Sequence, residues 1–212
     1  RFLGPSDVGV DASGNAYVAE PEGHSIRKVT PAGEVSTLAG LGGTWGGVDG
    51  TGSDSRFHTP SGVAVDGTGN VFVADKDNHA IRRVTPAGEV TTLAGRVGVR
   101  GYSDGTGRAA TFNGPTGVAV DGEGNVYVAD RSNHVIRKVT PGGFVSTLAG
   151  VPFVSGATDG PARTARFSSP RDVAVDGRGN VYVADTANST IRKLTPEGEV
   201  TTLAGVALVP GT

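Results

Sequence analysis

The sequence predicts an all-β fold in which one four-stranded antiparallel unit occurs four times. Three observations support this prediction. A segment that begins at Pro5 returns every 55 residues. Within each copy, short runs of Val, Ile and Leu alternate with turns that contain Gly or Pro, as is typical of strands joined by tight turns. The 35 Gly and 12 Pro residues lie between these regular apolar runs, which favours turns over disorder.

The repeat is evident without gaps. The string "PSDVGVDASGNAYVAE" at Pro5 returns as "PSGVAVDGTGNVFVAD" at Pro60, "PTGVAVDGEGNVYVAD" at Pro115 and "PRDVAVDGRGNVYVAD" at Pro170. Between residues 60–95 and 115–150, 26 of 36 positions are identical, which excludes chance similarity. We expect residues 1–212 to form a single domain, with repeats at about 1–55, 56–110, 111–165 and 166–212.

Each element of the second repeat follows from local sequence. Residues 62–66 and 70–75 alternate around the turn "DGTGN", where Gly69 supplies a positive φ, and so predict an antiparallel pair of strands. A third strand is predicted at 80–85. The segment "TPAGE" then gives a turn, and a fourth strand follows at 89–94.

A single sheet of this kind has two apolar faces that it cannot bury alone. Packing several such sheets as blades around an axis buries both faces, so the pattern predicts a β-propeller. The strand containing Val63, Ala64 and Val65 has the smallest apolar side chains, and we place it and its equivalents next to the axis. On this assignment the central channel offers no charge asymmetry.

The repeat resembles a known family. Residues 117–150, "GVAVDGEGNVYVADRSNHVIRKVTPGGFVSTLAG", are similar to an NHL repeat, including the Asn133 and His134 pair. The resemblance implies a propeller of four-stranded blades, in a family that spans adhesion, sensing, RNA binding and enzymes. Relatives usually close with six blades. Four repeats leave open a four-bladed ring, self-association of chains, or part of a larger propeller.

Some polar residues recur with the period, which indicates a structural role in every blade. They are expected to form partly buried acid and arginine pairs between blades: Asp75, Asp130 and Asp185, with Glu20 in the first repeat, and Arg27, Arg82, Arg137 and Arg192. The equivalent His24, His79 and His134 could in principle ligate a metal, but a role in stabilising turns is favoured. The Asp-Gly pairs at Asp49, Asp104 and Asp159 are interpreted as turns, not calcium loops.

Residues for recognition are expected in the three connections that differ most, 41–59, 96–114 and 151–169. Their bulky side chains without a counterpart in the other repeats resemble binding hot spots, and the histidines of the neighbouring turns lie on the same face. The candidate partner-binding residues are therefore Trp45, Arg100, Tyr102, Phe153, His79 and His134. The recurring Phe57, Phe112 and Phe167 are predicted to be core residues.

Charge and composition limit the classes of function that the chain can have. A net charge of −2 gives no general attraction to nucleic acid or anionic membranes, and no apolar run approaches the length of a membrane span. The absence of Cys leaves the redox compartment open, and the absence of Met predicts that Arg1 follows a processing or excision site. No phosphate loop, G-x-S-x-G elbow or zinc protease motif occurs.

The sequence therefore predicts a non-enzymatic binding or sensor module that is extracellular or periplasmic. It would recognise a protein or glycan through the face of the long connections. No catalytic residue, cofactor or metal ligand is predicted. The alternatives left open are a metal-dependent lactonase or lyase-like enzyme, an RNA-binding domain, and an engineered repeat protein without a ligand.

Overall fold

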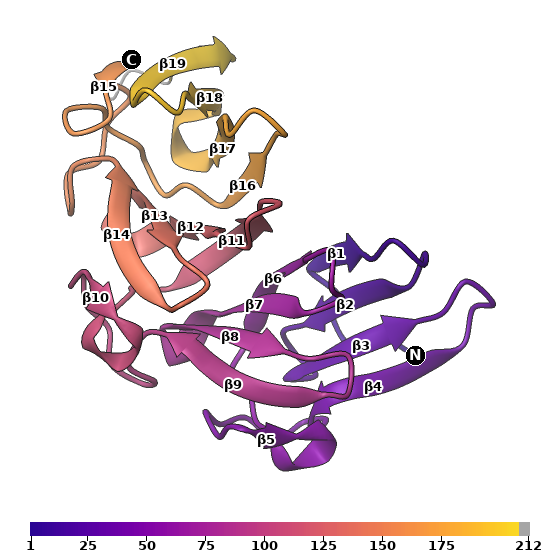
Figure 1. Ribbon diagram of the computed structural model, residues 1–212. Helices are drawn as coiled ribbons and strands as arrows, with labels where there is room; N and C mark the ends of the chain where they lie inside the picture. The colour runs from indigo at the N-terminus through magenta and orange to yellow at the C-terminus, as the bar shows by residue number, and fades with distance from the viewer. Residues whose placement is uncertain (208–212) are drawn as a thin grey trace.

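The computed structural model, which describes residues 1–207, consists of four antiparallel sheets that follow one another along the chain (Figure 1). Sheet 1 contains β1 (Asp7–Val10), β2 (Ala16–Glu20), β3 (Ser25–Val29) and β4 (Val35–Gly40). Sheet 2 contains β5 (Gly50–Thr51), β6 (Pro60–Val65), β7 (Val71–Asp75), β8 (Ala80–Val84) and β9 (Glu89–Ala94). The predicted strands of the second repeat are thus found within one or two residues of their expected bounds.

Sheets 3 and 4 repeat this plan. Sheet 3 contains β10 (Gly105–Thr106), β11 (Pro115–Val120), β12 (Val126–Asp130), β13 (Val135–Val139) and β14 (Phe144–Ala149). Sheet 4 contains β15 (Gly160–Pro161), β16 (Asp172–Val175), β17 (Val181–Asp185), β18 (Thr190–Leu194) and β19 (Glu199–Ala204). A one-turn 3-10 helix joins the second and third long strands in sheets 2 to 4, at Lys76–Asn78, Arg131–Asn133 and Thr186–Asn188.

The four long strands of each sheet form a meander, and the sheets pack face to face. The strands β1, β6, β11 and β16 each pair on one side only, and neighbours in this series lie against one another. They form the inner edge shared by the sheets, as predicted from their small apolar side chains. Small residues are required there because a Cβ on Gly62 would lie 2.3 Å from the Thr116 carbonyl oxygen of the next sheet.

The connections contribute a fifth strand that the sequence did not predict. The two-residue strands β5, β10 and β15 pair with β9, β14 and β19, the last strand of the sheet that follows them. Each connection therefore crosses the outer edge of the next sheet before the chain reaches the inner edge. Two further 3-10 turns, Gly52–Asp54 and Gly107–Ala109, follow β5 and β10.

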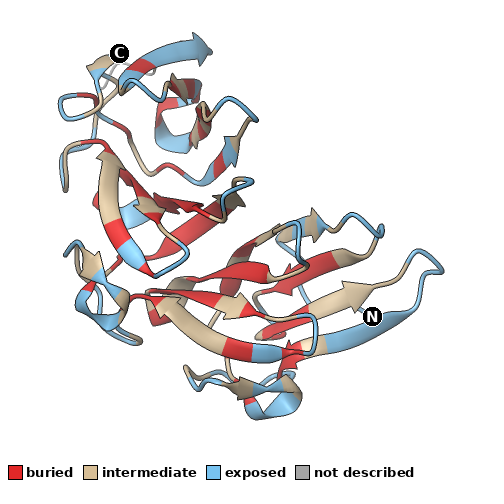
Figure 2. Ribbon diagram, in the orientation of Figure 1, coloured by how far each residue is buried: buried red, intermediate tan, exposed pale blue. Residues whose placement is uncertain are grey.

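The hydrophobic core lies between the sheets in three layers (Figure 2). Alternation along each strand sends one set of side chains toward the preceding sheet and the other set toward the following sheet. Between sheets 2 and 3, Phe72 and Ile81 of sheet 2 meet Val118, Val128 and other apolar residues of sheet 3. Among residues 1–207, no helix is long and apolar enough to cross a membrane.

Candidate binding face

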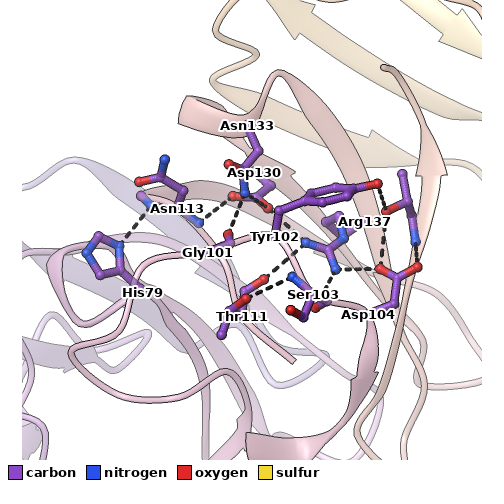
Figure 3. A network of polar contacts seen from close by, with 12 residues as sticks. His79, Gly101, Tyr102, Ser103, Asp104, Thr111, Asn113, Asp130, Asn133 and Arg137 are labelled. Atoms are coloured by element: carbon purple, nitrogen blue, oxygen red, sulfur yellow. Dashed lines mark hydrogen bonds and ion pairs between the residues drawn. The ribbon is translucent and has the colours of Figure 1, made fainter. Parts of the chain in front are cut away.

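Each of sheets 2 to 4 holds a fully buried arginine between two carboxylates. In sheet 3, Nη1 of Arg137 lies 3.0 Å from Oδ2 of Asp130, and Nη2 lies 2.6 Å from Oδ1 of Asp104 in the connection (Figure 3). The guanidinium also donates hydrogen bonds to the carbonyl oxygens of Ser103 and Thr111. Because the planar guanidinium presents several donors at fixed angles, one side chain holds the connection against the sheet.

The acid that ends the second long strand is the centre of this network. Oδ1 of Asp130 accepts a hydrogen bond from the backbone N–H of Asn113 at 2.8 Å, and Oδ2 accepts one from the Asn133 side chain at 2.8 Å. The same Asn133 amide donates to the Gly101 carbonyl oxygen at 2.8 Å. The Asp-x-x-Asn spacing of the repeat therefore fixes both ends of the connection.

The other sheets repeat the network with one exception. Burial raises the pKa of Asp75 to about 6, and the charge of the neighbouring Arg82 acts in the opposite direction. In sheet 1, Arg27 is partly exposed and lies 3.3 Å from Glu20. The complete sets are Asp75, Arg82 and Asp49 in sheet 2, Asp130, Arg137 and Asp104 in sheet 3, and Asp185, Arg192 and Asp159 in sheet 4.

The repeated histidines join neighbouring sheets. Nδ1 of His79 accepts a hydrogen bond from the backbone N–H of Gly114 at 3.0 Å, and Nδ1 of His134 accepts one from Ser169 at 2.9 Å. His24 accepts the equivalent bond from Thr59 at 3.2 Å. Burial lowers the pKa of all three imidazoles, which favours the neutral form that keeps Nδ1 free to accept. Two of the predicted partner-binding residues, His79 and His134, thus contact the next sheet.

The donor residue in these contacts has left-handed backbone geometry. Thr59, Gly114 and Ser169 have φ values of 54°, 61° and 49°. Glycine adopts this conformation without strain, whereas a β-branched residue such as Thr adopts it at a cost. Thr59 is held there by His24 and lies beside His58, the residue on which Trp45 stacks.

We expect Thr59→Gly to raise the free energy of unfolding by about 1 kcal/mol, because relief of the backbone strain exceeds the extra entropy of the unfolded chain. Chemical denaturation measures the change. Gly114→Thr is the matched reverse substitution and should lower stability by a similar amount. Equal stability of all three proteins would show that the left-handed positions carry no strain.

The unmatched bulky residues lie in two groups on one face. Trp45 is 65% exposed and stacks on His58 with ring centroids 4.8 Å apart. Phe153 is 66% exposed and contacts Tyr102 edge to face at 5.5 Å. Tyr102 lies over the Arg137 guanidinium, and its hydroxyl is 2.9 Å from the Thr147 hydroxyl. The structure therefore brings Tyr102 and Phe153 together, while Trp45 belongs to the preceding connection.

We call this surface the loop face: the three connections, 41–59, 96–114 and 151–169, together with the 3-10 turns beside them. Backbone hydrogen bonds place these segments together, since Gly98 N–H donates to the Asn78 carbonyl and Phe153 N–H donates to the Asn133 carbonyl. Arg100 is exposed in the second connection and forms an isolated β-bridge with Phe112.

An acidic depression lies where the inner strands begin, and sequence reasoning missed it. It has a volume of about 250 Å³, and its lining includes Asp7, Thr116, Arg171 and Asp172. Burial raises the pKa of Asp172, and the charge of Asp7 raises it further. The expectation of a channel without charge asymmetry is therefore wrong at this end. The signal was present in the sequence, because "PSD" and "PRD" stand where the other repeats have "PSG" and "PTG".

The side of the molecule opposite the loop face carries larger clefts, each between the hairpin turns of two neighbouring sheets. One of about 440 Å³ lies between sheets 3 and 4 and is lined by residues such as Asp121, Lys138 and Arg178. A similar cleft of about 330 Å³ lies between sheets 2 and 3. Because the cleft recurs at successive junctions, it follows from the stacking of the repeats and does not single out one site.

Comparison with known proteins agrees with this architecture. The model of a family described as NHL repeat matches residues 57–84, 112–138 and 167–194. Teneurin-3 of Danio rerio is 30% identical over 222 residues, covering 91% of this chain and 8% of that protein. NHL repeat-containing protein 2 of Bos taurus is 34% identical over 151 residues, covering 64% of this chain and 20% of that protein. The chain thus spans a small part of the length of these relatives.

Solved structures share the fold. A protein described as an auxiliary nutrient binding protein from Bacteroides ovatus has a TM-score of 0.71 at 24% identity, covering 96% of this chain and 49% of that chain. A putative gluconolactonase has a TM-score of 0.63 at 14% identity, covering 99% of this chain and 66% of that chain. At these identities the likeness establishes a β-propeller fold and does not assign an activity.

Proposed function

Because the chain is an NHL-repeat protein, we propose that it is a non-enzymatic binding module whose loop face recognises a protein partner. The observation that supports this most directly is Trp45. It is largely exposed, it is held in place by stacking on His58, and no other repeat has an aromatic residue at its position. Exposed aromatic side chains on a rigid support are typical centres of binding energy.

The second group of aromatic residues supports the same face. Phe153 is exposed, and its partner Tyr102 is fixed by Arg137 and Thr147. The side chains are therefore anchored by residues of the sheet, so little conformational entropy would be lost when a partner binds. Because the two groups belong to different connections, a partner that covers both would need an extended surface, which favours a protein over a small molecule.

We include in the proposal that this protein acts in an extracellular or periplasmic location. One similar structure is described as an auxiliary nutrient binding protein, and teneurin-3 is similar to this chain over 91% of the chain's length. A glycan ligand is the second possibility for the same face, since sugar rings stack on exposed indoles such as Trp45.

The enzyme alternative has one observation in its favour, the acidic depression that contains Asp7 and Asp172. Within residues 1–207, however, no three side chains of His, Cys, Asp or Glu lie close enough to form a metal-binding group. Two carboxylates from different sheets are a smaller donor set than the six to eight oxygens of a calcium site. Binding through the loop face is therefore the better supported function.

The chain offers a direct readout because Trp45 is its only tryptophan. We expect a partner to shift Trp45 emission to shorter wavelength and to protect it from iodide quenching. Candidate proteins captured on the immobilised chain would be titrated individually, with a glycan array in parallel to test the other class of ligand. Hydrogen exchange should show protection in 41–59, 96–114 and 151–169. Protection confined to the hairpin turns at 66–70 and 121–125 would contradict the proposal.

Trp45→Ala is expected to weaken partner binding by about 2 kcal/mol or more, roughly thirtyfold in Kd, while scarcely changing the melting temperature. The reason is that most of the indole is exposed in the free protein and would be buried by the partner. Calorimetry with the captured protein measures the affinity. Thr68→Ala, on an exposed turn of the opposite edge, is the control and should leave Kd unchanged. Equal loss with both variants would exclude a hot spot at Trp45.

A further inference from the structure

Phe153 has a backbone conformation for which the other connections use glycine. Its φ is 62°, and the equivalent Gly43 and Gly98 have φ values of 74° and 76°. The backbone N–H of each of the three donates to a carbonyl oxygen of the turn beside it, on Gly23, Asn78 and Asn133. This left-handed conformation is strained for a large side chain, and the Phe153 ring is 66% exposed, so burial offsets little of the cost. Strain of this kind is typical of functional sites.

The three connections form one continuous surface around this ring. A Cβ on Gly47 would lie 2.2 Å from Cγ1 of Val97, so the first and second connections touch. The rings of Tyr102 and Phe153 join the second connection to the third. Further exposed apolar side chains lie on the same segments: Leu41, Val48, Val99 and Val154. Several such side chains on adjoining segments are typical of an interaction site.

The exposed ionic groups beside the aromatic residues are basic. Arg96 and Arg100 are exposed in the second connection. Arg131 is exposed at the start of the 3-10 turn whose last residue, Asn133, accepts the hydrogen bond from the Phe153 backbone. None of the three arginines forms an ion pair within residues 1–207. Their positive charges are therefore available to a partner.

The neighbouring carboxylates already have cationic partners. Asp104 lies 2.6 Å from the Arg137 guanidinium, and its other carboxylate oxygen accepts a backbone hydrogen bond. Asp77 lies 3.7 Å from the ammonium group of Lys76. Because Nδ1 of His79 accepts a backbone hydrogen bond, its neutral ring carries the hydrogen on Nε2 and adds a donor (Figure 3). The polar groups that this surface leaves free are thus mainly hydrogen-bond donors.

We propose that the partner meets the loop face with an acidic protein segment, whose apolar side chains pack on Phe153 and whose carboxylates pair with Arg100 and Arg131. This inference rests on the proposed function and adds the chemistry of the partner. A protein is favoured over a nucleic acid because aliphatic side chains such as Val99 and Val154 do not stack on bases. Three arginines are also few for a surface that binds by counterion release. Aromatic and Arg side chains together are typical of the centres of protein interfaces.

The test is the selection of peptides from a random library displayed on phage, with the immobilised chain as bait. Each selected peptide is titrated against the chain while Trp45 emission and hydrogen exchange are followed. We expect the peptides to combine Asp or Glu with large apolar residues, to protect the loop face, and to bind about tenfold more weakly when salt rises from about 50 mM to about 500 mM.

The outcomes separate this inference from the proposed function. Peptides that protect the loop face without an excess of Asp and Glu would overturn the acidic segment and leave binding through the loop face intact. A failure to select peptides, or protection confined to the hairpin turns at 66–70 and 121–125, would overturn both. Tighter binding of a twenty-residue oligothymidylate than of any selected peptide would show that the occupant is a nucleic acid.

Variants test the two kinds of contact separately. Arg100→Glu and Arg131→Glu should each raise the Kd of a selected peptide about tenfold. Arg178→Glu is the control, because Arg178 is exposed on a hairpin turn on the side opposite the loop face, and it should leave Kd unchanged. Equal weakening by all three charge reversals would show a general effect of net charge and refute the assigned pairs.

Phe153→Gly restores the residue type of the other connections. It should weaken peptide binding about thirtyfold, as for a hot spot, while raising the melting temperature by about 2–4 °C through relief of the backbone strain. Because the variant is expected to be more stable than the unaltered chain, unfolding cannot account for the weaker binding. Unchanged affinity in Phe153→Gly would refute the role of this ring.

Discussion

Arg137→Ala is expected to lower the free energy of unfolding by about 3–5 kcal/mol, because it leaves the buried carboxylate of Asp130 without its cationic partner. The substitution also removes the donors that hold the carbonyl oxygens of Ser103 and Thr111. Urea denaturation followed by far-ultraviolet circular dichroism measures the loss. After correction for the unfolded fraction, any partner affinity should be unchanged, since the guanidinium is fully buried.

Arg27→Ala is the matched control for this prediction. Arg27 occupies the equivalent position in sheet 1, but it is partly exposed, lies 3.3 Å from Glu20, and has no second carboxylate partner among residues 1–207. Its loss should cost less than about 1 kcal/mol, as for a surface ion pair. Similar losses for Arg27→Ala and Arg137→Ala would show that the buried pair is not the source of the stability.

Phe112→Ala is expected to cost about 3–5 kcal/mol in unfolding free energy, because it opens a cavity in the core between sheets 2 and 3. The ring is fully buried and lies 5.2 Å from the Arg137 guanidinium, so the substitution also removes a cation–π contact. Thermal unfolding by calorimetry would show the loss as a fall in melting temperature.

Phe153→Ala provides the comparison for Phe112. Both residues lie in connections, but Phe153 is mostly exposed and has no aromatic equivalent in the other repeats. We expect Phe153→Ala to change stability by less than about 0.5 kcal/mol. A large loss with Phe153→Ala would mean that this side chain packs into the connection and is not available to a partner.

The regular part of the fold could be predicted because it is expressed in local periodicity. The alternating apolar residues and tight turns predicted the long strands of the second repeat, and the small side chains around Val63 predicted which strand lies at the inner edge. The recurring phenylalanines at 57, 112 and 167 were predicted to be core residues, and all three are fully buried. These features depend on short-range sequence patterns, and the same patterns occur in each repeat.

The contacts between distant segments could not be predicted in the same way. Asp49 was interpreted as a turn residue, but its carboxylate lies 2.7 Å from the Arg82 guanidinium, 33 positions away in the chain. The strand β5 has two residues, too few to show alternation. The backbone strain at Thr59 depends on a histidine in the preceding sheet. Each of these features is decided by packing, for which the local sequence carries no periodic signal.

The position of β5, β10 and β15 affects how the chain divides into exchangeable modules. The sequence repeat of sheet 2 starts most visibly at Pro60, yet residues from Gly46 onward already bond to sheet 2, since the Asn78 side chain donates to the Gly46 carbonyl and β5 pairs with β9. Residues up to Gly43 bond instead to sheet 1. The module that can be removed, duplicated or grafted intact therefore runs from about residue 46 to residue 100. A cut made at Pro60 would leave each graft without its two-residue outer strand and without the second carboxylate that pairs with its buried arginine. Trp45 stands at this boundary, so an exchange of modules would change the neighbours of this proposed partner-binding residue while leaving every buried ion pair complete.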